Sequence, residues 1–180
     1  MFRWRGPGHP GEGDSLVGNW PGSGGLFGDS IAGVLTITRG DGYELSSDPG
    51  RLDIDRVHHW LATDAYWALG RPQETVLRAI EGSAAYGIYG PGDRGQVAFA
   101  RAVTDGATFA WLCDVYVDPA ERGNGLGRWL VGAVRDDLAD RGVRRILLAT
   151  WDAHGVYAKL GFNPLAEPDH WMELDWRPGR

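Results

Sequence analysis

The sequence predicts a mixed α/β domain, and three observations favour that class. Residues 84–90, 95–103 and 107–119 read as three successive strands, separated by turns that contain Gly, Asp or Pro. An amphipathic helix follows at residues 126–142, and a continuous apolar run follows it at residues 143–150. The first feature predicts an antiparallel meander, and the other two together predict a strand–helix–strand crossover.

The beginning of the chain has a different composition from the rest. Residues 1–30 are dominated by Gly, Pro and Ser and show no period of 2 or 3.6, so we expect a flexible tail there. Residues 33–39 can add one short strand. We therefore divide the chain into a tail at residues 1–42 and a folded domain at residues 43–180, which begins with a weakly alternating strand at residues 43–49.

Two helices are expected before the meander. Asp53 or Asp55 caps the first, which lies within residues 52–70 and has the apolar residues Val57, Trp60, Leu61 and Ala65 at helical spacing. Pro72 lies at the start of the second helix and Gly82 at its end, which are the positions that these residues favour.

The elements after the meander follow the same signals. Helix 126–142 presents an apolar stripe at the spacing i, i+3, i+4, i+7, i+8 and i+12, formed by Leu126, Trp129, Leu130, Ala133, Val134 and Leu138. Residues 143–150 read as a buried strand. A short helix at residues 152–161 has Asp152 as its expected cap, and residues 170–176 read as a closing strand.

Composition narrows the classes of function. The 180 residues carry a formal net charge of −6, which argues against a nucleic-acid partner because such domains present a net basic surface. No run approaches the ~18 apolar residues of a membrane span, so we expect a cytoplasmic protein with no membrane partner. We expect either a monomer or a homodimer. The single cysteine, Cys113, excludes an intramolecular disulfide and reads as a small buried residue. No metal is expected, because no cluster of His, Cys and carboxylates has metal-ligand spacing.

A glycine-rich loop, Arg122–Gly127 with the sequence RGNGLG, lies between the last meander strand and the amphipathic helix. It is not a P-loop, because no Lys-Ser/Thr pair follows Gly127, and Arg128 occupies the third glycine position of the dinucleotide fingerprint. The glycines let successive N–H groups converge on one point, and the helix N-terminus adds unpaired N–H groups and a positive dipole end. The arrangement suits a pyrophosphate, and a tight strand-to-helix turn is the alternative interpretation.

The same loop resembles the R/Q-x-x-G-x-G/A motif of the GNAT superfamily of acyl-CoA-dependent N-acetyltransferases. The resemblance continues upstream through DVYVDP and downstream through VYAKLGF, and it covers residues 43–176. It implies the GNAT fold, a mixed and mostly antiparallel sheet with helices on both faces, and acetyl-CoA as cosubstrate. The segments VHHWLATDAYWALGRP and LLATWDAHGVY look like a bacterial subset whose substrates are generally unassigned.

The resemblance also implies which residues bind the cosubstrate. The backbone of Val115, Tyr116 and Val117 would hydrogen-bond the pantetheine arm as an added strand would. The pyrophosphate would be held by the amides of the loop and the side chain after it, that is, by Arg122, Gly123, Asn124, Gly125, Leu126, Gly127 and Arg128. Thr150 stands where many members carry an Asn that contacts the cofactor, and Ala153 matches the small residue usual at its position.

The catalytic roles are carried over in the same way. Tyr157 matches the family's usual general acid, which protonates the departing thiolate, and a Tyr with a pKa near ~10 keeps its proton at neutral pH. Its alternative is a buried ring whose hydroxyl bonds a backbone carbonyl. Asp114 is the positional candidate for the base that receives the proton of the amine, and a salt-bridged or solvent-facing Asp is the alternative there. His58, His59 and His154 are further possible bases, although such histidines are more often satisfied surface or core groups.

The acceptor is less well defined than the cosubstrate. The family's usual arrangement places residues 65–72 and 167–171 around the acceptor pocket, with Tyr66 and Trp67 in its wall. We therefore expect transfer of an acetyl group to a primary amine of a small molecule or peptide, by direct attack in a ternary complex. A non-catalytic acyl-CoA-binding module is the alternative, because it would keep the loop without competent proton-transfer groups.

Overall fold

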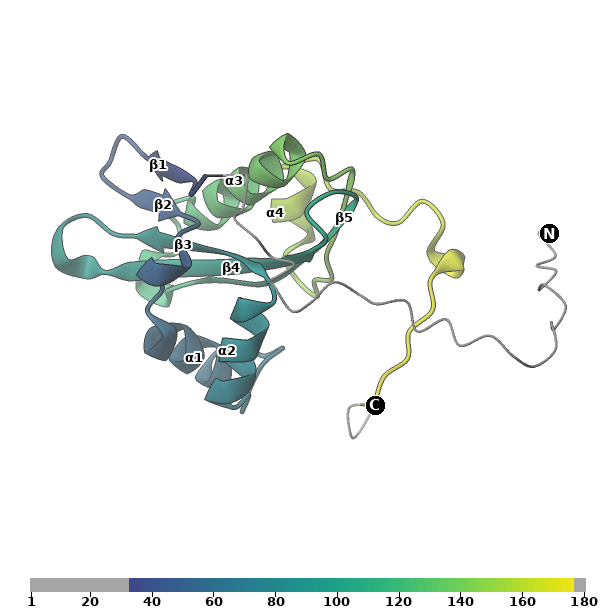
Figure 1. Cartoon of the computed structure of the whole chain (residues 1–180), viewed down its shortest axis with the longest axis horizontal. Coiled ribbons are helices and arrows are strands. Elements are labelled where there is room, and N and C mark those ends of the chain that lie inside the picture. The colour runs from purple at the N-terminus through teal and green to yellow at the C-terminus, as the bar shows by residue number, and fades with distance from the viewer. Residues whose placement is uncertain (1–32, 177–180) are drawn as a thin grey trace, which may run out of the picture. The chain divides into compact units, whose positions relative to one another are not determined.

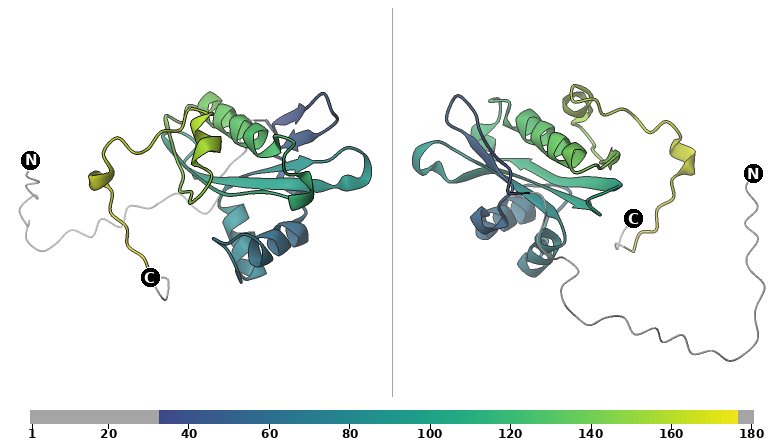
Figure 2. Two further views of the ribbon diagram at one scale, coloured as in Figure 1. Left: turned by 180° about the vertical axis from the view of Figure 1, so that it is seen from behind. Right: turned by 45° about the horizontal axis from the view of Figure 1, so that its top comes forward.

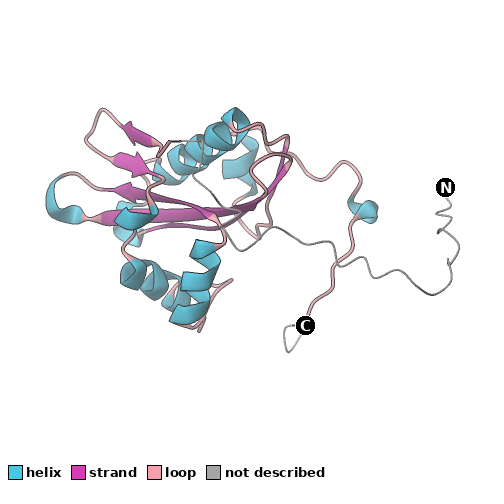
Figure 3. Ribbon diagram, viewed as in Figure 1, coloured by secondary structure: helices cyan, strands magenta, loops and turns pink. Residues whose placement is uncertain are grey.

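The computed structural model describes residues 33–176, and the tail expected at residues 1–30 lies outside this range (Figure 1). Six strands form one sheet in the order β1-β2-β3-β4-β5-β6. They span, in chain order, Thr36–Thr38, Glu44–Ser46, Ala84–Tyr89, Gln96–Thr104, Phe109–Val117 and Arg145–Leu147. Neighbouring strands are antiparallel from β1 to β5, and only β5 and β6 pair in parallel. The predicted mixed and mostly antiparallel sheet is confirmed (Figure 3).

Helices α1 (Ile54–Thr63) and α2 (Gln73–Glu81) cover one face of the sheet (Figures 1 and 2). The Asp53 side chain caps α1 by accepting a hydrogen bond from the Arg56 amide, and Pro72 precedes α2. The buried residues on this face form a cluster of Val57, Trp60, Leu61, Ala65, Ala68, Val76, Ile80, Ala85, Phe99 and Tyr116.

Helices α3 (Leu126–Asp140) and α4 (His154–Ala158) cover the opposite face (Figure 2). The apolar stripe predicted for the long helix packs there, with Leu126, Leu130, Val134 and Leu138 each 1% exposed or less. This is the larger core, and burial of such side chains stabilises a domain by roughly 1.5–3 kcal/mol each. Short 3₁₀ turns complete the fold at Pro49–Arg51, Gly92–Arg94, Pro119–Glu121 and Pro168–His170.

Strands β5 and β6 pair only over part of their length. Phe109, Ala110 and Trp111 pair with residues 145–147, and no further rung follows. Beyond this point β5 continues to Val117, so the edge of β5 that faces β6 is unpaired from residue 112 onward. The chain therefore opens a gap in the sheet at its β5–β6 end.

The structure departs from the sequence prediction in three elements. Helix α1 ends at Thr63, so residues 64–70 form a turn and not the end of the helix. The predicted cap Asp152 is outside α4, whose first flanking residue is Ala153 with no side-chain cap. The segment at residues 143–150 contains only the short strand β6, which is partly exposed because it lies at the edge of the sheet.

The predicted closing strand at residues 170–176 is wrong. These residues follow a 3₁₀ turn without joining the sheet, and Met172, Leu174 and Trp176 are exposed. Their period-2 pattern fits a strand, but a strand forms only where another strand's edge pairs with it. At the other end of the sheet, β1 pairs with β2 and lies before Tyr43, where we expected the domain to begin.

Candidate active site

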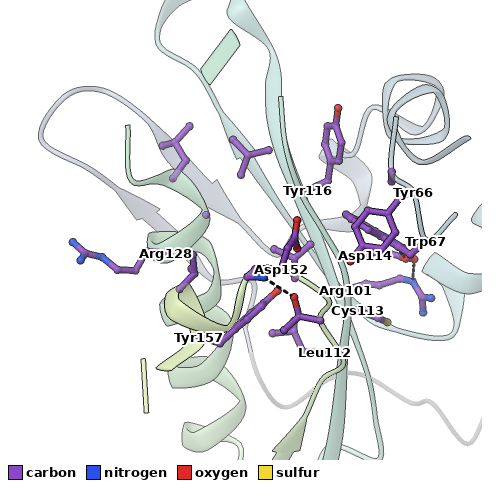
Figure 4. Close-up of a pocket in the computed structure, with 18 of the residues that line it drawn as sticks. Tyr66, Trp67, Arg101, Leu112, Cys113, Asp114, Tyr116, Arg128, Asp152 and Tyr157 are labelled. Atoms are coloured by element: carbon purple, nitrogen blue, oxygen red, sulfur yellow. Dashed lines mark hydrogen bonds and ion pairs between the residues drawn. The ribbon is translucent and has the colours of Figure 1, made fainter. Parts of the chain in front are cut away.

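A cavity of about 930 Å³ occupies the gap between the diverging strands (Figure 4). Its lining comes from five places: the turn between α1 and α2, β4 at Arg101 and Val103, β5 from Trp111 onward, the glycine-rich loop with its flanking residues, and the segment at residues 149–157. All of the predicted cofactor-binding residues except Asn124 line it, together with Asp114, Tyr157, Tyr66 and Trp67. Residues 167–171, also expected around the acceptor pocket, do not line it. The fold thus brings together residues that are separated by up to 93 positions in the sequence, from Asp64 to Tyr157.

The glycine-rich loop presents amide groups to this cavity. Among the described residues, no amide N–H of residues 123–128 donates a hydrogen bond, and the first amide of the helix with a backbone acceptor is that of Trp129, which donates to the Gly125 carbonyl at 3.0 Å. Gly123 and Gly125 have φ values of 89° and 73°, a left-handed conformation that side chains with a Cβ rarely adopt. Unpaired amides at a helix N-terminus attract an anion, as the sequence predicts for this loop.

Side chains of the loop have different roles from their amides. Leu126 is buried in the core, so only its backbone faces the cavity. Arg122 donates to the Val117 carbonyl at 2.9 Å and to Asp64 at 3.1 Å, and Asp64 also accepts from the Tyr116 hydroxyl at 2.5 Å. The Arg122 side chain therefore ties the end of β5 to the end of α1.

Asn124 and Arg128 line a second hollow next to the loop. Asn124 lines that hollow of about 460 Å³, and its carbonyl accepts a hydrogen bond from Arg39 at 3.2 Å. Arg128 lines both cavities, and Figure 4 shows its guanidinium pointing away from the other labelled residues. Sequence reasoning missed Arg39, because it lies 85 positions before Asn124 and carries no motif.

The second half of β5 supplies one wall of the cavity with its unpaired edge. Val115 and Val117 pack toward the α3 face, whereas Tyr116 is buried on the α1–α2 face, as strand alternation predicts. Their backbone pairs with β4 on one side only. An extended ligand arm could therefore take the place of a neighbouring strand along this edge.

Tyr157 lies on α4 and points toward β5 (Figure 4). Its ring packs edge-on against Phe162, with ring centroids 5.8 Å apart. Burial raises the pKa of Tyr157, and the nearby Tyr66 and Asp152 raise it further. Within the described part of the chain its hydroxyl makes no hydrogen bond, so the alternative of a phenol held by a backbone carbonyl is not what the structure shows. The phenol keeps its proton and presents it to the cavity.

Asp114 lies in a bulge of β5. Asp114 and Val115 together stand opposite Ala100, and Asp114 has a φ of 51°, which is rare outside glycine. The bulge turns a carboxylate that is only 3% exposed toward three donors. Arg71 and Arg101 each donate to Oδ2 at 2.7 Å, and Trp67 donates to Oδ1 at 3.1 Å.

These contacts determine the protonation state of Asp114. Burial by itself would raise the pKa of the carboxyl, but the charge of Arg101 and the hydrogen bonds from Arg71 and Arg101 outweigh it and hold the pKa below its usual range. A carboxylate with a lowered pKa and three donors is a weak proton acceptor. The geometry therefore favours the salt-bridged alternative for Asp114 over the catalytic base.

Tyr66 and Trp67 lie in the turn after α1 and line the cavity, as predicted. They are 53% and 42% exposed, and their rings pack edge to face with centroids 4.9 Å apart. The Trp67 indole bonds Asp114, so the network around the bulge holds this turn in position.

The remaining candidates have other environments. None of His58, His59 and His154 lines the cavity, and His58 Nε2 lies 3.1 Å from the Arg71 carbonyl oxygen, to which the ring can only donate. Cys113 lines the cavity, but burial raises the pKa of its thiol to about 11, so no thiolate forms at neutral pH. Thr150 also lines it, and its hydroxyl oxygen accepts from the Ala153 amide at 3.1 Å.

Asp152 is a cavity residue that sequence reasoning assigned only as a helix cap. It lines the cavity close enough to Tyr157 to influence its pKa, and among the described residues no hydrogen bond or ion pair holds its carboxylate. Over residues 33–176, no group of three or more His, Cys, Asp or Glu side chains is arranged to hold a metal ion. Nor does any helix in that range have the length and apolar character needed to cross a membrane.

A sheet that opens beside an amide-lined loop, with helices on both faces, is the architecture of an acetyltransferase. The chain belongs to the acetyltransferase (GNAT) family, whose model matches residues 54–162. A solved GNAT-family structure from Xanthomonas campestris pv. campestris has a TM-score of 0.69 and 45% sequence identity, and the match covers 76% of this chain and 94% of that one.

Curated relatives agree with this assignment. The Gibberella zeae protein named "Putative acetyltransferase FG08082" is 33% identical over 151 residues, which is 73% of this chain and 85% of that protein. Serotonin N-acetyltransferase 2 of Oryza sativa subsp. japonica is 38% identical over 96 residues, which is 51% of this chain and 48% of that enzyme. The predicted family membership and fold are thus confirmed.

The loop glycines allow a matched test of backbone conformation. Gly125→Ala is expected to destabilise the protein by about 1–2 kcal/mol, because a Cβ in the left-handed conformation meets the adjacent carbonyl. Gly127→Ala is its control, since Gly127 lies in the helix and a Cβ there would make an ordinary 3.5 Å contact with Val117. Urea unfolding should show no loss for Gly127→Ala. Equal stability of the two variants would contradict a conformational requirement at Gly125.

The Asp114 network predicts a pH-dependent contribution to stability. Asp114→Asn keeps the side-chain shape but leaves two guanidiniums without their carboxylate, which should lower the free energy of unfolding by about 3–5 kcal/mol at pH 7. Because the folded-state pKa is lowered, the wild-type advantage is complete above the unfolded pKa of ~4 and is lost as the pH falls through the folded value. Urea titrations from pH 7 to pH 3 measure this difference, with the exposed Asp136→Asn as control. A gap that does not narrow in acid would contradict the assignment.

Proposed function

We propose that this chain transfers an acetyl group from acetyl-CoA to a primary amine of a small molecule or peptide. The observation that carries the proposal is the continuity of the cavity. It runs from the unpaired amides of the glycine-rich loop, along the free edge of β5, to the protonated phenol of Tyr157. A serotonin N-acetyltransferase among the relatives acts, by its name, on an amine, which supports an amine acceptor.

The residues present fit acetyl-CoA. The amides of residues 123–128 would hold the pyrophosphate, and the backbone of residues 115–117 would hydrogen-bond the pantetheine arm as an added strand. This direction of binding leads the thioester toward Tyr157. The side chain of Arg122 contributes indirectly, because it holds the end of β5 and the loop in register through Val117 and Asp64.

The proposed reaction is a direct attack. The neutral amine adds to the thioester carbonyl, the carbon–sulfur bond breaks, and the coenzyme A thiolate leaves as Tyr157 supplies its proton. The proton that the attacking nitrogen loses then restores the Tyr157 phenol, so the products are the N-acetyl amine and the coenzyme A thiol. An acetyl-cysteine intermediate is disfavoured, since the Cys113 thiol stays protonated at neutral pH. Asp114 acts as a positioning residue in this proposal. It holds Trp67 and Arg71, and with them the turn that forms the acceptor side of the cavity.

Ligand stabilisation tests the choice of cosubstrate. Acetyl-CoA at about 100 times its dissociation constant is expected to add about 2.7 kcal/mol of stability and to raise the melting temperature by about 5–10 °C. ATP and NAD should have no such effect, because neither offers a pantetheine arm for the β5 edge. Differential scanning fluorimetry measures the shifts. An equal rise with NAD would overturn the proposal.

Tyr157→Phe tests the general acid. At saturating substrates, the variant should retain its affinity for coenzyme A but lose about 10²-fold or more in kcat, because the step that needs the proton is slowed. Tyr89→Phe is the matched control, since Tyr89 is a tyrosine outside the cavity whose buried hydroxyl has no hydrogen-bond partner in the described structure.

Turnover is measured by coenzyme A release, and cofactor affinity by calorimetry. An unchanged rate of Tyr157→Phe between pH 7 and pH 9 would remove Tyr157 from the mechanism. Coenzyme A binding without release of acetyl groups to any of a library of polyamines, amino acids, aminoglycosides and peptides would instead favour a non-catalytic acyl-CoA-binding module.

A further inference from the structure

The acceptor side of the cavity contains more positive than negative charge. Arg71 and Arg101 both donate to one oxygen of Asp114, so two guanidiniums share a single carboxylate that is 3% exposed. Neither arginine forms an ion pair with any other acidic side chain of the described residues. Two guanidiniums and one carboxylate together carry one net positive charge. The side chain of Arg71 is only 21% exposed, and that of Arg101 only 14%.

A buried cluster with this imbalance favours an anion. Two like charges that converge on one oxygen repel each other. This repulsion is stronger in the protein interior than in water, because the interior has a lower dielectric constant. A second anion beside Arg71 and Arg101 would relieve it, with charge-assisted hydrogen bonds to the guanidinium N–H groups that Asp114 and the Ser83 hydroxyl leave unused. Both arginines line the cavity, so such an anion would arrive with the ligand.

The acidic groups of the protein do not fill this role. Asp64 bonds Arg122 and Tyr116, and Glu121 bonds Tyr43 and Arg94, on the loop side of the cavity. Asp152 lies near Tyr157, at the place where the proposed reaction needs the amine. Opposite charges are thus separated along the cavity, with a carboxylate near the acid catalyst and two guanidiniums at the Asp114 bulge.

Beside the arginines lies an apolar area of the same sheet face. Arg101 pairs across the strands with Cys113, and Val103 pairs with Trp111 two residues further along. Val103 and Trp111 line the cavity and are 45% and 38% exposed. Their contact area suits an apolar group of the acceptor that lies next to its anionic group.

We propose that the acceptor is an amine that also carries an oxyanion group, a carboxylate or a phosphate, and that Arg71 and Arg101 bind this group. The inference rests on the proposed acetyl transfer and names its substrate class. The amine is directed toward Asp152 and Tyr157, and an apolar portion contacts Val103 and Trp111. Asp114 limits the affinity for the anion, because it already neutralises one of the two guanidiniums.

Matched acceptors test the substrate class. Phenylalanine, phenylalanine amide and phenethylamine differ in the group next to the same amine, and phosphoethanolamine and ethanolamine form the corresponding pair for phosphate. In the preferred series, the acceptor with the carboxylate or phosphate should have a kcat/KM about 10- to 100-fold higher than its partner without that anion. This is the range expected for hydrogen bonds to a charged group. Uncharged amines used as well as their acids, in both series, would overturn the proposal.

Arginine variants test the residues. Arg71→Gln should raise KM for the anionic acceptor, so that the ratio of kcat/KM for the anionic acceptor to kcat/KM for its partner without the anion falls toward 1. Arg78→Gln is the matched control, since it removes one exposed positive charge from α2 outside the cavity. Arg71 is chosen because it is the more exposed of the two arginines, and circular dichroism verifies that the variant folds. An unchanged preference in Arg71→Gln would contradict the assignment of the anion to this pair.

A binding measurement keeps the inference testable without turnover. With coenzyme A saturating, so that the glycine-rich loop is filled, inorganic phosphate should raise the melting temperature of the wild type and of Arg78→Gln more than that of Arg71→Gln at constant ionic strength. An equal rise in all three would overturn the anion site. Failure of the proposed acetyl transfer is a separate result, seen as the absence of stabilisation by acetyl-CoA itself.

Discussion

The separation of β5 from β6 is the constraint on which the rest of the site depends. Three residue pairs join the two strands, and beyond Trp111 the edge of β5 has no neighbouring strand among residues 33–176. Backbone groups in the interior require hydrogen-bond partners, so an unpaired edge inside a sheet is retained only where water or a ligand can reach it. The glycine-rich loop follows the end of this edge, and α4 places Tyr157 across the cavity from β5. One gap therefore brings together the amides of the loop, the free edge of β5 and the phenol of Tyr157.

Charged side chains join β5 to the α1–α2 side of the cavity. Arg122 joins the end of β5 to Asp64 at the end of α1, and the Asp114 bulge joins the middle of β5 to the turn before α2. Buried charges of this kind contribute little net stability compared with an apolar core, since their desolvation offsets their attraction. Their effect is on position. Their directional hydrogen bonds fix the positions of Trp67 and Arg71 relative to β5, whereas an apolar contact has no such direction.

Several features of the site could be predicted from local sequence, because they follow from local chemistry. The glycine spacing predicts a loop of converging amides, and the helix after it predicts the dipole that supports them. The apolar stripe from Leu126 to Leu138 predicts which face of α3 is buried. Other features had no local signal. The contact between Arg39 and Asn124 joins residues 85 positions apart. Asp152 lines the cavity, but the residues around it in the sequence equally fit a helix cap.

The sequence by itself predicted most of the element order and the two features on which the proposed function rests, the glycine-rich loop and Tyr157, since each depends on residues within about 15 positions of one another. Only the tertiary structure decided the role of Asp114. Strand alternation assigns it a face, but its protonation and its contacts depend on Trp67, Arg71 and Arg101, which come from a turn and from another strand. The closing strand shows the same limit, because the pattern at residues 170–176 satisfies a strand and yet pairs with no edge of the sheet. Long-range pairing and charge are properties of the fold, and no period in the sequence encodes them.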